Sequence, residues 1–101
     1  MTAMAHEVRF HPWERVRVTM TLTADGALRI KGQDLRGLEY EYVITVPPAD
    51  LPTVRQALGG GPESDLLQLL RQHGDAIIER GELSWLRELG ISPEFWAHRE
   101  S

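Results

Sequence analysis

The chain has 101 residues, of which 42% are hydrophobic, a size that supports one domain with one core and is too small for two. It contains no cysteine, which excludes disulfides, thiolate metal sites and cysteine nucleophiles. The formal net charge of -4, from 15 acidic and 11 basic residues, gives no reason to expect a polyanionic partner. We therefore expect a single domain over residues 1–101.

The first twenty residues lack the long apolar segment of a secretory signal, because charged and histidine side chains interrupt them. No stretch of the sequence approaches the ~20 apolar residues that span a bilayer. These observations predict a cytoplasmic protein without a membrane partner. Most of the basic residues are arginine, a bias that is typical of GC-rich bacterial genomes.

Residues 6–46 have the alternating hydrophobic pattern of β-strands. We predict four strands, of which the first has the weakest pattern: His6–Phe10, Arg15–Thr23, Leu28–Gln33 and Leu38–Val46. A turn at His11–Trp13 would connect the first two. A three-residue loop, Ala24–Gly26, would place Leu22 opposite Leu28, which keeps the apolar side chains of both strands on one face.

A second three-residue loop, Asp34–Arg36, is predicted between the last two strands. It would place Ile30 opposite Tyr40, with two pairs of opposite charge on the other face, Lys31 with Glu39 and Arg29 with Glu41. Each such pair contributes about 0.2 to 1 kcal/mol, so the charges favour this register. Pro47 and Pro48 then end the sheet.

The second half of the chain has helical spacing. The spacing of apolar residues in 47–62 predicts a short helix capped by Asp50, followed by a flexible joint at Gly59–Gly61. The main helix would begin at Ser64 or Asp65 and continue through Gly74 to about Arg80, with Gly74 kept small for packing and Gly81 as the cap.

Two further helices are predicted after Gly81. The first covers Glu82–Leu89. The second begins at Ser92 with Pro93 in its first position, and Ile91 and Trp96 would form a hydrophobic staple at its start.

The predicted fold class is α+β: an antiparallel β-meander of three to four strands followed by three to four C-terminal helices packed on one sheet face. The domain would consist of a β-sheet half (6–46), a short helix with the glycine-rich joint (47–62) and a helical half (64–99).

Candidate catalytic and ligand-binding residues are few. His73 lies within the apolar arc of the main helix, where an imidazole could act as a general base, and His98 is a second histidine of this kind. Neither has a nucleophile or carboxylate at a suitable spacing, and a buried histidine is more often a packed residue. The glycine run is not followed by the Lys-Ser/Thr of a phosphate-binding loop. We expect no enzymatic activity, cofactor or metal.

Two surfaces are candidates for binding another protein. Acidic residues gather along the outer face and end of the main helix and would attract a basic partner: Asp65, Asp75, Glu79 and Glu82. Trp13 stands in a turn and would be an interface anchor if it were exposed, although core burial is the commoner outcome. The alternative is the polar sheet face, with Arg15, Arg17, Arg29, Lys31, Glu39 and Glu41. Its acidic residues and its lack of aromatic residues argue against nucleic-acid binding.

By elimination, the sequence favours a small non-enzymatic protein-binding domain, of the immunity or inhibitor type, that neutralises a partner enzyme or toxin. The alternative is a homo-oligomeric scaffold or regulatory module that pairs through its exposed sheet face or an open edge strand. An enzyme that uses His73 is the third hypothesis.

Overall fold

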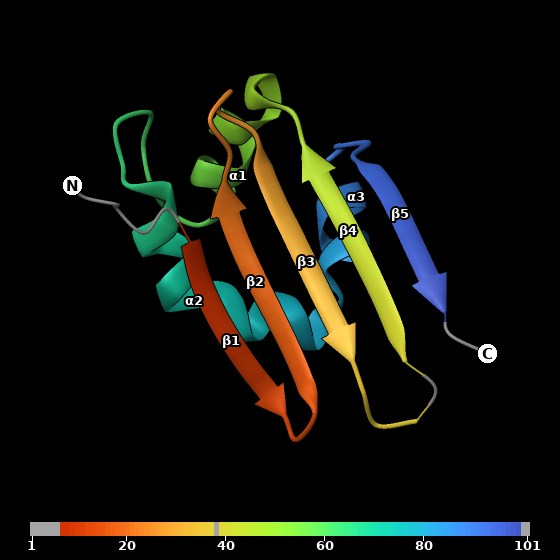
Figure 1. The fold of residues 1–101 in the computed structure, drawn as a ribbon. Coiled ribbons are helices and arrows are strands. Elements are labelled where there is room, and N and C mark those ends of the chain that lie inside the picture. Colours follow the sequence, from red (N-terminus) through yellow and green to blue (C-terminus); the bar gives the residue numbers. More distant parts are fainter. Residues whose placement is uncertain (1–6, 38, 100–101) are drawn as a thin grey trace.

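A computed structural model describes residues 7–37 and 39–99, which form a five-stranded antiparallel sheet and three α-helices (Figure 1). The strands lie in sequence order across the sheet: β1 (Glu7–Trp13), β2 (Val16–Leu22), β3 (Leu28–Asp34), β4 (Tyr40–Val46) and β5 (Glu94–Arg99). A short 3-10 helix (Pro48–Asp50) precedes the α-helices α1 (Leu51–Ala57), α2 (Leu66–Arg80) and α3 (Glu82–Glu88). The α+β class is confirmed, but the helices lie between β4 and β5 in the sequence.

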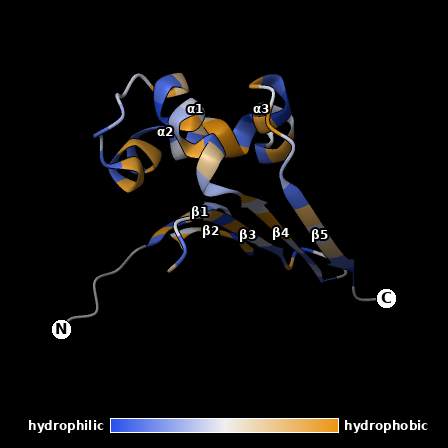
Figure 2. Cartoon of the chain, turned by 90° about the horizontal axis from the view of Figure 1, so that it is seen from above, coloured by the Kyte–Doolittle hydropathy of each residue, from blue (hydrophilic) through white to orange (hydrophobic). Residues whose placement is uncertain are grey.

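The helices cover one face of the sheet and leave the other uncovered (Figure 2). Alternate residues of the central strands point toward the helices and are buried, as the period-two pattern requires: Val18, Met20, Leu28, Ile30, Ile44 and Val46. The helices complete this core with Leu51, Val54, Leu66, Leu70, Ile77 and Leu86. No helix in the described part of the chain is both long and apolar enough to cross a membrane.

The predicted β2–β3 hairpin is confirmed. Leu22 lies opposite Leu28 and Met20 opposite Ile30, and the Thr23 amide donates to the Ala27 carbonyl at 2.8 Å. Gly26 has φ +88°, a left-handed conformation that glycine adopts without the Cβ clash of other residues.

The predicted β3–β4 register is wrong by four residues. Ile30 lies opposite Ile44, and Lys31 opposite Val43, so the predicted charge pairs are not cross-strand neighbours. The strand β3 continues to Asp34, whose carboxylate accepts from the Arg36 backbone amide and guanidinium. The same hydrogen bonds lower the pKa of Asp34 from 3.8 to about 2. Because the observed β3–β4 register differs from the predicted one by an even number of residues, every side chain keeps its predicted face. The predicted strand start at Leu38 lies outside the described residues.

The predicted turn at His11–Trp13 is also wrong, because β1 continues through these residues to a turn at Glu14 and Arg15. The β1–β2 register shifts between Phe10 and Trp13, which marks a β-bulge. Pro12 lies within this irregularity on an edge strand, where its missing amide hydrogen is tolerated.

The main helix is confirmed with its predicted caps. The Asp65 carboxylate accepts from the Leu67 and Gln68 amides at 3.1 and 3.3 Å, and Gly81 is the C-cap residue with φ +103°. Asp50 occupies the N-cap position of α1, but its side chain makes no capping hydrogen bond.

Gly74 lies where α2 crosses β1, and a Cβ atom there would be 2.1 Å from Cζ of Phe10. We expect Gly74→Ala to destabilise the protein by about 1 to 3 kcal/mol through overpacking, which outweighs the gain of about 1 kcal/mol in helix propensity. Denaturant unfolding measures this loss. In a Phe10→Ala background the ring is absent, so Gly74→Ala should then be neutral or stabilising; an equal loss in both backgrounds would contradict the predicted clash.

The predicted last helix is wrong, because Glu94–Arg99 forms the edge strand β5. Ile91 is buried, but Trp96 is 53% exposed, so the predicted staple does not form. Ser92 and Pro93 are local helix-start signals, whereas all six residues of β5 pair with β4, from Tyr40 opposite Arg99 to Thr45 opposite Glu94. This long-range pairing outweighs the local preference of a six-residue segment.

Candidate protein-binding surfaces

Trp13 lies at the end of β1, directly after the bulge. The bulge brings Trp13 opposite Val16, which belongs to the helix-facing side of β2. The indole is nevertheless 46% exposed, because it lies at the edge of the sheet. The guanidinium carbon of Arg36 lies 5.6 Å from the ring centroid, within range of a cation–π contact that restrains the ring.

Two of the four predicted acidic residues lie beside Trp13. Asp75 and Glu79 are exposed and one helical turn apart on α2, and they line one surface hollow together with Trp13, Ile78, His11 and Pro12. We call these six residues the Trp13 surface. The arrangement places a half-exposed indole and two carboxylates around the same surface hollow, on elements held by the core.

The other two predicted acidic residues have structural roles. Asp65 caps the N-terminus of α2, ten residues before Asp75 and therefore about 15 Å away along the helix. Glu82 is only 7% exposed and accepts a hydrogen bond from the Tyr42 hydroxyl at 2.5 Å. The prediction that Glu82 belongs to a solvated outer face is wrong. Sequence spacing alone did not reveal this, because its partner is 40 residues away.

The Tyr42–Glu82 hydrogen bond joins the sheet to α3. Burial of the tyrosine and the hydrogen bond to Glu82 raise the pKa of Tyr42 well above its usual value of 10. The ring also lies over β3, because Gly32 is directly opposite Tyr42 and leaves space for it: a Cβ atom on Gly32 would be 2.2 Å from the ring.

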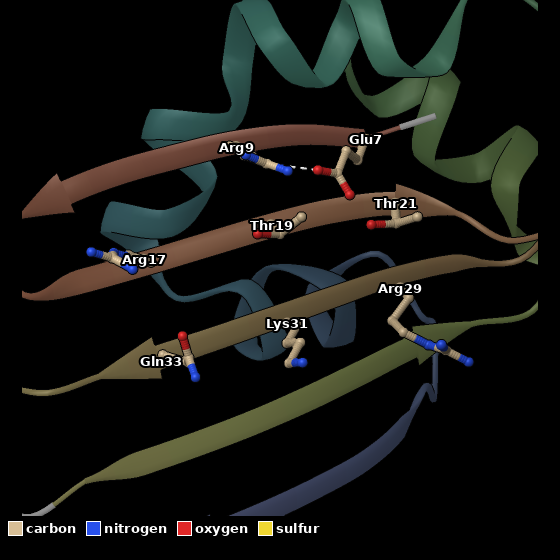
Figure 3. Close-up of a pocket in the computed structure, with 8 residues that line it drawn as sticks. All are labelled: Glu7, Arg9, Arg17, Thr19, Thr21, Arg29, Lys31 and Gln33. Atoms are coloured by element: carbon tan, nitrogen blue, oxygen red, sulfur yellow. Dashed lines mark hydrogen bonds and ion pairs between the residues drawn. The ribbon is translucent and has the colours of Figure 1, made fainter. Parts of the chain in front are cut away.

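The uncovered face of the sheet carries the predicted basic residues Arg17, Arg29 and Lys31 on β2 and β3 (Figure 3). They line a shallow hollow with Thr19, Thr21, Gln33, Glu7 and Arg9. Arg9 is a cation that the sequence prediction missed, although its place in the alternation of β1 gives its face. It forms an ion pair with Glu7 at 2.6 Å.

Of the remaining three residues predicted for this face, two lie outside the strands and one lies on the sheet as predicted. Arg15 is in the β1–β2 turn with φ +65°, and Glu39 precedes β4. Glu41 does lie on the sheet and accepts from the Gln33 side-chain amide at 3.0 Å. The face is therefore a mixed surface in which acidic and amide groups surround the basic residues.

The candidate catalytic histidines are not part of a cluster. His73 is exposed on α2, so its predicted place in the buried arc is wrong. His98 lies in β5, and its ring stacks on Trp96 with centroids 6.1 Å apart. Within residues 7–37 and 39–99, no three histidine, aspartate or glutamate side chains are grouped to hold a metal ion.

Comparisons with protein-family models, with curated proteins and with solved structures find no match to this chain.

Proposed function

We propose that this chain is a cytoplasmic protein-binding module that neutralises a partner enzyme or toxin, as immunity and inhibitor proteins do, and that it binds this partner through the Trp13 surface. The observation that carries the proposal is the half-exposed indole of Trp13 between the sheet edge and the carboxylates of Asp75 and Glu79. No catalytic role is assigned to the chain.

Tryptophan is among the residues that contribute most to binding free energy in protein interfaces. The Trp13 ring is restrained by Arg36 and lies beside a helix that is packed on the core, so little conformational entropy would be lost on binding. The two carboxylates place part of the chain's net negative charge of -4 at this surface. These features fit a partner with a basic surface, because complementary charge speeds association and fixes orientation.

The proposal predicts which substitutions abolish capture of a partner. The immobilised protein is incubated with lysate from the source cells, and bound proteins are quantified by mass spectrometry. We expect one partner to be retained by the wild type and lost with Trp13→Ala and with Glu79→Lys. Glu63→Lys is the matched control, since it makes the same charge change at another exposed residue and should retain the partner.

Kinetics with the purified partner then test the role of charge. Reversing Asp75 and Glu79 together should slow association and flatten its salt dependence, because surface charges are screened over about 8 Å at physiological ionic strength. The wild type should inhibit the partner's activity, and Trp13→Ala should not. An unchanged association rate would contradict the proposal. Loss of binding with Arg17→Glu and Arg29→Glu instead would assign the interface to the uncovered sheet face.

A further inference from the structure

The two edge strands of the sheet differ in how they are protected. The strand β1 has a bulge, contains Pro12 and has α2 packed against it, all of which hinder pairing with another strand. The strand β5 pairs with β4 in continuous register and has no proline between Glu94 and Arg99. All six of its residues are exposed, and it forms the outer edge of the sheet (Figure 1).

Large apolar side chains are concentrated on this unprotected edge. Phe95 is 48% exposed and Trp96 is 53% exposed. They project to opposite faces, because Phe95 lies opposite Ile44 and Trp96 opposite Val43. Arg99 does not shield the edge, since its guanidinium carbon lies 5.1 Å from the Tyr40 ring on the neighbouring strand. Adjacent exposed aromatic residues on an open edge are the feature that single-sheet proteins usually avoid.

The sequence of β5 is complementary to itself in the antiparallel direction. If two copies pair around a two-fold axis normal to the sheet, opposite residues share a face and one residue of β5 lies opposite its own copy at the axis. The centre of Glu94–Arg99 falls between Trp96 and Ala97. One of these two residues therefore lies at the axis when the two strands overlap as far as possible. With Trp96 on the axis, Glu94 is opposite His98 of the partner subunit at both ends of the pair. Phe95 is then opposite Ala97 of the partner subunit, so the large ring meets a small residue.

We propose that β5 is a dimerisation edge, where two copies of this chain pair antiparallel and join their sheets into one continuous sheet. The helices of both copies lie on the same side of that sheet. The Trp13 surface belongs to the opposite edge, at β1, and stays accessible in the dimer. The inference is therefore independent of the proposed function.

Sedimentation velocity over a concentration series tests the dimer. We expect the wild type to sediment at twice the 11.5 kDa chain mass and Trp96→Lys at the mass of one chain. Trp13→Lys is the matched control, because it replaces a similarly exposed tryptophan with the same charge, and it should remain dimeric. Circular dichroism checks that both variants fold. A monomeric wild type, or equal dissociation of both variants, would overturn the proposal.

Single cysteines test the strand and the register, because the native chain has no cysteine. A residue on the two-fold axis has its copy about 4.5 to 5.5 Å away between Cα atoms, within the range of a disulfide. Mild oxidation should therefore cross-link Trp96→Cys or Ala97→Cys into a covalent dimer, according to which residue lies on the axis, and should leave Trp13→Cys monomeric. Failure of both β5 variants to cross-link, or equal cross-linking of all three, would overturn the proposal.

Discussion

Gly32→Ala should lower the free energy of unfolding by about 2 to 5 kcal/mol, although it adds a single methyl group to a strand. The added Cβ atom would lie 2.2 Å from the Tyr42 ring. This ring cannot simply swing away, because its hydroxyl donates to the buried Glu82 carboxylate. The substitution therefore forces either an overpacked β3–β4 pair or the loss of a buried hydrogen bond. Urea unfolding monitored by tryptophan fluorescence measures the change.

Gly37→Ala is the control for this experiment, because nothing lies within 4 Å of the Cβ position at Gly37. It should change stability by less than about 0.5 kcal/mol. A Tyr42→Ala background tests the cause. Without the ring, adding Gly32→Ala should lower the free energy of unfolding only slightly below that of Tyr42→Ala alone. If Gly32→Ala and Gly37→Ala had equal effects, the proposed close approach of the ring to β3 would be refuted.

Tyr42→Phe should destabilise the protein by about 1 to 3 kcal/mol, because it leaves the buried Glu82 carboxylate without its donor. The phenyl ring keeps the packing over Gly32, so the loss reports on the hydroxyl. Tyr40→Phe is the matched control, since it removes a hydroxyl from the same strand without affecting the bond to Glu82, and its effect should be smaller. Thermal and urea unfolding at neutral pH provide the comparison.

The same tyrosine predicts a stability loss at alkaline pH. Its pKa is raised in the folded state, so the folded protein retains the Tyr42 proton at a pH where the unfolded chain has lost it. Its contribution to stability is fully present below pH 10, the usual value, and is lost as the pH rises toward the folded pKa. The slope is about 1.4 kcal/mol per pH unit for one proton. Unfolding experiments from pH 9 to 11 should show no such loss below pH 10 and this slope developing above it in the wild type, and not in Tyr42→Phe; identical slopes would contradict the assignment.

Features that depend on neighbours in the sequence were predictable. The alternation of β2, β3 and β4 assigned their buried faces, because side chains of a strand alternate whatever its partner is. The β2–β3 hairpin register followed from a short loop that had to keep both apolar faces together. The α2 helix was predicted with both ends, since Asp65 and Gly81 satisfy backbone groups within one turn of themselves.

The candidate binding residues were only partly predictable. Asp75, Glu79 and Trp13 were each identified from residue type and spacing, but their proximity depends on how α2 lies against β1. Glu82 has the same helical spacing as an exposed acid, and only the position of Tyr42 makes it a buried acceptor. Burial of one polar side chain depends on a partner from a distant strand, and local periodicity contains no information about that partner.

The α+β class, the faces of the central strands and the caps of α2 follow from the amino-acid sequence, because they depend on local geometry. The β3–β4 register depends on long-range packing, since a shift of four residues leaves every side chain on its face and the hydrophobic pattern fits both registers equally. Long-range pairing also makes Glu94–Arg99 a strand. That segment is preceded by local helix signals, but its backbone hydrogen bonds go to β4, a strand about fifty residues earlier. Local preferences contain no information about a partner at that distance in the sequence.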